Sequence, residues 1–428
     1  MAAKFVNIDR DTPLLLPPDL RDWVKADHMV HFVMDAVDAL DLGRARVNER
    51  GTGSAQYPPS MMLGLLIYSY ATGTFSSRRI ECQTYENVAV RLLCADTHPD
   101  HDSICKFRRE NKELLVSAFH QVLELAANAR VLKVGDITVS IDGTKILASA
   151  SKHSAMSYDH VEKQMKIAEE QIGELLAKAE EADSTPLQDG LSIPEEIKRR
   201  EDRIAKLKEA KKAMEERARA QLEIEQAEYE AKLAAREARE KETGRKSRSK
   251  KPGPPSAGPR PKDQYNFTDP ESRIMKDGGS FEQCYNAQAA VEVETMLIVS
   301  NRVSDAPNDK EQMQPTLAAV SPTVGTVSAA LVDSGYYSEK AVAAVEDEGR
   351  GPKVYAAMKR QSHGRSVSQL EERPDPPAPP PGAKVGEIMA HRLETKAGRK
   401  LYGLRKQTVE PVFGIIKETL GFRRFLLQ

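Results

Sequence analysis

The first 130 residues repeat apolar positions at helical spacing. The run MMLGLLIYSYATG is mostly apolar; Pro58 and Pro59 precede it and Gly73 ends it, which are start and stop signals of a helix. The pattern HDSICKFRRENKELLVSAFHQVLELAANARVL then reads as one long amphipathic stretch with Leu114 and Leu125 among its apolar positions. We therefore predict a helical N-terminal domain over residues 1–130.

Strand patterns appear in two later regions. Residues 136–148 alternate around a β-branched run that ends on Asp142, and the apolar run TVSAALV ends on Asp333. NAQAAVEV and TMLIVSNRV read as the strands of a hairpin, and KVYAAM as a further short strand. Because the apolar run before Asp333 needs both faces covered, we predict an α/β fold with one mixed sheet. Its strands come from residues 136–148, 285–304 and 327–357.

A helical excursion interrupts this sheet. Residues 155–242 are rich in Glu, Lys, Ala and Arg, with apolar residues at heptad-like intervals. This pattern predicts one or two long helices, with a coiled-coil hairpin broken near residues 184–186 as one arrangement. Residues 245–262 follow with several Lys and Arg, including Lys250 and Lys251, and no acidic residue. Their proline and glycine content predicts a disordered basic loop.

Overall charge is nearly balanced, with 63 Lys and Arg against 64 Asp and Glu among 428 residues, so its distribution is more informative than its sum. Basic pairs stand at Arg78–Arg79 and Arg108–Arg109, and residues 384–428 are basic as well. Solvated helix faces explain each pair taken alone. Together with the basic loop they are compatible with a DNA-binding protein.

Other features exclude several classes. The four cysteines include no C-x2-C pair, so neither a zinc site nor a disulfide framework is predicted. No apolar run approaches the length of a membrane span. The N-terminus is interrupted by Asp and Pro and lacks the apolar region of a signal peptide. We expect a protein without a membrane partner that works in a reducing cytoplasm.

Three carboxylates form the candidate catalytic constellation. Asp142 and Asp333 each end a strand, and Glu410 lies late in the chain on a predicted helix. A single aspartate after a strand is usually a turn cap. Two of them at the edge where α/β sheets build sites, with a third carboxylate, suit an oxygen-ligand site for Mg²⁺.

These stretches resemble the DDE transposases of bacterial insertion sequences, whose catalytic core is RNase H-like. The matching motifs are IDGTKI, NFTDPESRIMK, YNAQAAV, VDSGYYSE and TVEPVFGIIK followed by GFRRFLL, in the family's order, with HDSICKFRREN in the helical region. Each motif alone is weak, but the ordered set is specific. The resemblance implies an RNase H-like mixed sheet in a core of residues 131–154 and 276–428, with a coiled-coil-like helical insertion at 155–275.

The resemblance also implies roles for residues. Asp142, Asp333 and Glu410 fall on the catalytic triad that would bind Mg²⁺, with Mn²⁺ as an alternative ion. Around the glutamate, Tyr402, Arg405 and Lys417 occupy the family's Tyr, Arg and Lys positions, and Lys406 shares the place of Arg405 because the gap to the glutamate is one residue longer. These four are expected to contact DNA, as are Arg78, Arg79, Arg108, Arg109, Lys250 and Lys251.

The expected activity is Mg²⁺-dependent cleavage and strand transfer at insertion-sequence ends. Its partners would be double-stranded DNA, both terminal inverted repeats and target, and further copies of the chain in a homodimer or larger synaptic complex near the nucleoid.

Two other hypotheses for the function stay open. Relatives continue past GFRRFLL, whereas this chain stops at Gln428, which fits a truncated, inactive DNA-binding remnant. A coiled-coil scaffold would explain residues 155–242 but not the triad.

Overall fold

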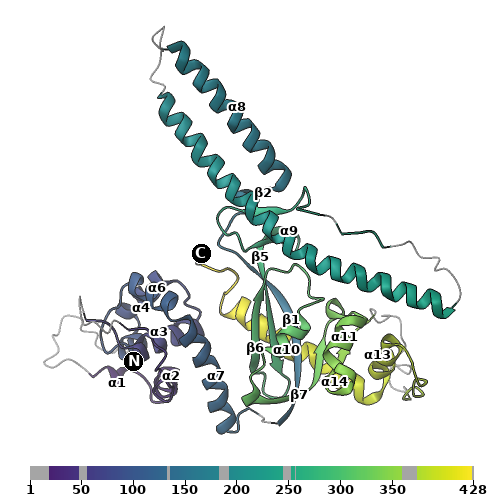
Figure 1. The fold of residues 1–428 in the computed structure, drawn as a ribbon. Helices are drawn as coiled ribbons and strands as arrows, with labels where there is room; N and C mark the ends of the chain where they lie inside the picture. Colours follow the sequence, from purple (N-terminus) through teal and green to yellow (C-terminus); the bar gives the residue numbers. More distant parts are fainter. Residues whose placement is uncertain are drawn as a thin grey trace, which may run out of the picture. The chain divides into compact units, whose positions relative to one another are not determined.

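The computed structural model describes residues 19–47, 55–132, 135–182, 192–243, 252–255, 257–358 and 374–426. The chain divides into two compact units. One comprises Met1–Ile146, Asn286–Ser304 and Asn308–Leu426, and the other comprises Leu147–Tyr285, Asp305–Pro307 and the last two residues. The first unit therefore holds both the N-terminal helices and most of the sheet, and the second holds the helical excursion (Figure 1).

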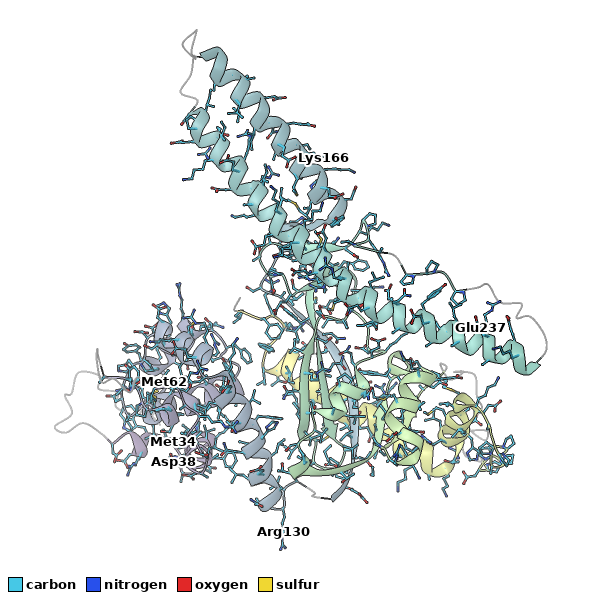
Figure 2. The ribbon with its side chains drawn as sticks, in the orientation of Figure 1. Met34, Asp38, Met62, Arg130, Lys166 and Glu237 are labelled. Atoms are coloured by element: carbon cyan, nitrogen blue, oxygen red, sulfur yellow. The ribbon has the colours of Figure 1, made fainter. Side chains whose placement is uncertain are left out.

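The N-terminal region is helical, as predicted. Its helices are α1 (Leu20–Trp23), α2 (Met29–Asp38), α3 (Pro59–Ala71), α4 (Ser77–Glu86), α5 (Val88–Leu93), α6 (His101–Glu110) and α7 (Lys112–Asn128). The apolar helix α3 is the centre of their core, with Leu63, Leu65 and Leu66 fully buried. Figure 2 shows Met62 of the same helix among the side chains of this cluster.

The long amphipathic stretch of residues 101–132 contains two helices, α6 and α7. Asn111 lies between α6 and α7, and its side-chain amide donates to the Phe107 carbonyl at 2.9 Å. Its side-chain oxygen accepts a hydrogen bond from the backbone N–H of Arg46 at 2.7 Å. An asparagine whose side chain competes for backbone groups interrupts a helix in this way.

The central sheet is mixed, which confirms the predicted fold class. Strands β4 (Arg273–Asp277), β5 (Ser280–Glu292), β1 (Gly135–Leu147), β7 (Gly325–Val332) and β8 (Lys353–Ala356) follow one another in that order, and β6 (Ile298–Ser304) also pairs with β5. The β5–β6 hairpin is antiparallel, whereas β1–β7 and β7–β8 are parallel. The three sequence segments expected to form one sheet do so (Figure 1).

One detail of the strand prediction is wrong. Strand β1 does not end at Asp142 but continues to Leu147. Its pairing with β7 stops at Ile141 and Val332, yet β5 remains its neighbour on the other side. Just past the end of β1, the N–H of Ala148 still donates to the Gln283 carbonyl at 2.8 Å. The strand therefore passes Asp142 because a second neighbour supports it.

Helices cover the sheet on both faces. On one face, Met313 of α10 (Met313–Ala318), Val342 of α11 (Glu339–Glu346) and Met389 of α13 (Val385–Glu394) join the core cluster of Ile141 and Val332. The other face of β5 presents Ala289 and Val291 to α14 (Lys396–Gly414), which contributes Val409 and Val412. Alternate residues of a strand point to opposite faces, so this packing fixes α14, and Glu410 with it, against the sheet.

The second unit is built on two long helices. α8 (Tyr158–Ala182) packs along the first part of α9 (Ile193–Thr243), and Val161 meets Leu207 and Met214 in their shared core (Figure 1). The short strands β2 (Ala155–Ser157) and β3 (Gln264–Asn266) pair at the base of these helices. Figure 2 labels Lys166 on α8 and Glu237 near the end of α9. The long helices predicted for the insertion are present, and its bounds of 155–275 stay a prediction. The predicted break at 184–186 lies outside the described residues.

Gly325, the first residue of β7, gives a test of the β1–β7 pairing. Its φ is +114°, and an added Cβ would lie 2.3 Å from the Gly135 oxygen. We expect Gly325→Ala to lower the free energy of unfolding by about 2–3 kcal/mol, because it combines backbone strain with a clash. Thermal denaturation measures this. The control is Gly349→Ala, since Gly349 has a φ of +91° but no heavy atom within 4 Å; equal losses would contradict close packing of β1 on β7.

Candidate active site

The two aspartates of the predicted triad lie side by side. Asp333 immediately follows β7, and Asp142 follows the last residue of β1 that pairs with β7. Because Ile141 and Val332 are register partners in a parallel pair, the next residues on each strand come to the same level. Neighbouring strands are about 4.8 Å apart, so the two carboxylates share one small volume.

Glu410 reaches this volume through an arginine. The Arg405 guanidinium lies 3.1 Å from Glu410 Oε1 and 3.7 Å from Asp142 Oδ2. The arginine side chain is 7% exposed, whereas that of Glu410 is 48% exposed. The Ser140 hydroxyl of β1 donates to the Arg405 carbonyl at 3.3 Å, which ties α14 to the strand that carries Asp142. All three predicted catalytic residues thus belong to one neighbourhood.

Burial dominates the electrostatics of Asp142. It raises the pKa of this carboxyl to about 6, against the opposing effects of the Gly143 N–H, which donates to Asp142 Oδ1 at 2.8 Å, and of Arg405. The pKa of about 6 already includes smaller upward effects of the Asp333 and Asp309 charges. A desolvated carboxylate beside two others is unfavourable without a compensating cation. Arg405 supplies part of that compensation in this structure.

The other residues predicted around Glu410 differ in their burial and in their contacts. The Tyr402 hydroxyl donates to the Val332 carbonyl at 3.1 Å, and burial raises its pKa. Tyr402 therefore acts as a neutral hydrogen-bond donor to the last residue of β7. Arg405 is held between carboxylates, whereas Lys406 is exposed. Lys417 is partly exposed and lies in the π-helical turn Ile415–Thr419 that follows α14.

The basic pairs of the N-terminal helices also differ from one another. Arg78 and Arg79 on α4 and Arg109 on α6 are exposed. Arg108 instead donates to the Tyr70 hydroxyl at 2.7 Å and is partly buried. This hydrogen bond links α6 to α3. Lys250 and Lys251 lie outside the described residues.

Sequence reasoning missed a fourth carboxylate, Asp309, which precedes α10. Its Oδ1 accepts hydrogen bonds from the side chains of Asn286 and Gln288, at 2.7 and 2.8 Å, and lies 3.9 Å from the Lys145 ammonium. A signal for it was present in YNAQAAV. Asn286 and Gln288 are polar residues two apart in an otherwise apolar strand, which places both on one face. Buried polar side chains in such a strand call for a polar partner.

No group of three or more His, Cys, Asp or Glu side chains is arranged to hold a metal ion within the ranges that the structure describes. The donor chemistry at Asp142 and Asp333 nevertheless suits a hard cation, since both ligands are carboxylates and burial disfavours the ionised form of Asp142. Glu410 pairs with Arg405 instead. In the described part of the chain, no helix is both long and apolar enough to cross a membrane.

Comparison with known families agrees with this geometry. Residues 18–110 match the family described as Transposase domain (DUF772), and residues 248–428 match the Transposase DDE domain. No curated protein and no solved structure gives a significant match. The second match contains Asp333 and Glu410, whereas Asp142 lies before it and is joined to the site by the β1–β7 pairing.

The sheet is mixed and has carboxylates directly after the paired residues of adjacent parallel strands. Together with the match to the Transposase DDE domain, this arrangement defines an RNase H-like fold. The two matches together identify the chain as a member of the DDE transposases of insertion sequences. The resemblance seen in the sequence motifs is therefore confirmed.

The raised pKa of Asp142 predicts how its replacement changes stability with pH. Because folding raises this pKa from 3.8 to about 6, the neutral carboxyl stabilises the fold below 3.8, and that contribution is lost as pH rises to about 6. In EDTA, Asp142→Asn should therefore raise the melting temperature by about 2–4 °C at about pH 8 and by much less near pH 4.

Asp136→Asn is the matched control, since Asp136 is an exposed aspartate on the same strand and should give no such pH-dependent gain. An Asp142→Asn gain that is absent, or equal at both pH values, would contradict the desolvation of this carboxyl.

Proposed function

We propose that this transposase cleaves DNA at the ends of an insertion sequence and joins the freed 3′ end to target DNA, in a reaction that depends on Mg²⁺ or Mn²⁺. The observation that supports it best is the register of β1 and β7, which brings Asp142 and Asp333 to adjacent positions. The Arg405 contacts add Glu410 to the same neighbourhood. The family match supports DNA as the substrate.

Asp142, Asp333 and Glu410 would hold the cation, with Arg405 beside Glu410 and Asp142. A divalent ion at this place lowers the pKa of a bound water or hydroxyl and stabilises charge on a phosphodiester. A backbone N–H and an arginine of the chain prepare this place. The Gly143 N–H orients one oxygen of Asp142, and Arg405 offsets the repulsion between Asp142 and Glu410.

DNA affinity would come from surfaces outside the carboxylates. Residues 1–130 would form the DNA-binding domain, with the exposed Arg78, Arg79 and Arg109 suited to recognition of the transposon ends. The basic residues of 245–262, together with Lys406 and Lys417, would contact phosphates without reading sequence. Such an enzyme would act as a homodimer or larger assembly on DNA in the cytoplasm, at the nucleoid.

A silent DNA-binding remnant is the second candidate function. The contact that favours it is the pairing of Glu410 with Arg405, which leaves the described carboxylates without a three-ligand arrangement. Cleavage by the wild-type chain decides between the two, because a remnant would bind transposon ends and cut none.

Replacement of the triad should separate chemistry from binding. Asp142→Asn, Asp333→Asn and Glu410→Gln should each lower the cleavage rate of a labelled transposon-end duplex in Mg²⁺ by at least about 100-fold, because groups that stabilise developing charge are worth that much. Affinity in a gel shift should stay the same or rise slightly, since negative charge near the phosphates is removed.

Glu418→Gln is the control for the last of these variants. Glu418 lies in the π-helical turn that follows α14, is exposed and pairs with Arg423, so its replacement should leave cleavage unchanged. Full cleavage by Glu410→Gln would remove Glu410 from the site and make Glu418 the next candidate.

The basic loop should contribute affinity without specificity. Lys250→Gln with Lys251→Gln should weaken binding to transposon-end and unrelated DNA by the same factor. The slope of log affinity against log salt should fall by about 0.9 for each phosphate that the protein no longer neutralises. Filter binding over a salt series measures both the affinity and the slope.

Lys212→Gln on α9, an exposed lysine paired with Glu216, is the control for removal of one positive charge. An unchanged salt slope would show that residues 245–262 only link two parts of the chain.

A further inference from the structure

A buried polar network lies beneath the two aspartates. Asn286 and Gln288 of β5 are 0% and 1% exposed, and both donate side-chain hydrogen bonds to Oδ1 of Asp309. Gln288 Nε2 also donates to Asn286 Oδ1 at 3.0 Å. Buried amides are costly to leave unpaired, so a network in which these donors are satisfied specifies one arrangement of its members.

One end of this network packs against the residue after Asp142. A Cβ added to Gly143 would lie 2.2 Å from Gln288 Nε2, 2.7 Å from Asp309 Oδ1 and 2.8 Å from Asn286 Oδ1. These distances leave no room for a side chain, so the network touches the backbone of Gly143 directly. The N–H of the same glycine donates to Asp142 Oδ1. The network therefore sets the position of the peptide that orients Asp142.

The other end holds the turn that begins at Asp333. The hydroxyl of Tyr336 donates to Gln288 Oε1, and the Tyr336 side chain is 1% exposed. The backbone N–H of Tyr336 donates to the Asp333 carbonyl at 3.1 Å within the 3-10 turn Ser334–Tyr336. Gln288 thus contacts both sides of the site, through its nitrogen toward Asp142 and through its oxygen toward Asp333.

We propose that Gln288, with Asn286, Asp309 and Tyr336, is a positioning device that fixes the spacing of Asp142 and Asp333. This inference rests on the proposed function, in which both aspartates hold the divalent ion. Two like charges would otherwise move apart before the ion binds. An error of about 1 Å in such a site lowers a rate by about 100-fold, so a rigid spacer has a large effect without touching substrate.

The test compares three network variants of the full chain with one surface control. Gln288→Met removes both polar atoms at similar volume, Tyr336→Phe removes only the hydroxyl, and Asp309→Asn removes the charge. Glu311→Gln is the control, because Glu311 is an exposed carboxylate two residues after Asp309. Mn²⁺ affinity by calorimetry, cleavage over an Mn²⁺ series, gel-shift affinity and melting temperature are measured for each.

We expect Gln288→Met to weaken Mn²⁺ binding by about 10-fold or more and to lower cleavage at saturating Mn²⁺ by about 10–100-fold, with DNA affinity unchanged. Tyr336→Phe should show the same split between metal and DNA on a smaller scale. Because both changes break the same hydrogen bond, the double variant should resemble Gln288→Met alone. Tyr336→Phe, which removes one oxygen atom, keeps the test open if Gln288→Met fails to fold.

Folded variants that keep the wild-type Mn²⁺ affinity and cleavage would overturn the inference, as would losses that affect Mn²⁺ and DNA binding equally and follow the melting temperature. Failure of the proposed function would give a different result from failure of this inference. A wild-type chain that binds Mn²⁺ but cuts no DNA would contradict the proposed function, and the Mn²⁺ affinities of the variants would still decide whether the network positions the aspartates.

Discussion

The parallel pairing of β1 with β7 is the constraint on which the rest of the structure depends. It joins two strands that are far apart in sequence and ends at Ile141 and Val332, directly before the two aspartates. The close approach of Gly325 to Gly135 begins the same pair. The core on one face and α14 on the other cover the sheet that contains this pair.

That pairing imposes an electrostatic cost, and the neighbouring residues offset it in two ways. Arg405 brings a buried positive charge to Asp142 and Glu410. The Gly143 N–H gives Asp142 one fixed hydrogen bond. Neither removes the effect of burial, since the pKa of Asp142 is still raised to about 6. A site that remains electrostatically unfavourable in the absence of a ligand is a recurring property of functional sites.

Glu410 differs from the two aspartates in how it is held. Val409 and Val412 anchor α14 on β5, and the Ser140 hydroxyl binds the Arg405 carbonyl, so the helix itself is fixed. The Glu410 side chain is nevertheless about half exposed. The aspartates are thus placed by strand register, whereas the glutamate is placed by a helix face and by one arginine.

Sequence patterns by themselves determined the element types and the class of protein. Apolar spacing identified α3, the β5–β6 hairpin and the long helices of the insertion, because each depends on local periodicity. The ordered motifs around Asp142, Asp333 and Glu410 identified the transposase family. Only the tertiary structure decided that β1 continues past Asp142 and that Arg405 lies between carboxylates. It alone also decided that Asp309 joins Asn286 and Gln288. Each of these depends on a neighbour distant in sequence, and local spacing carries no information about which strand or side chain that neighbour will be.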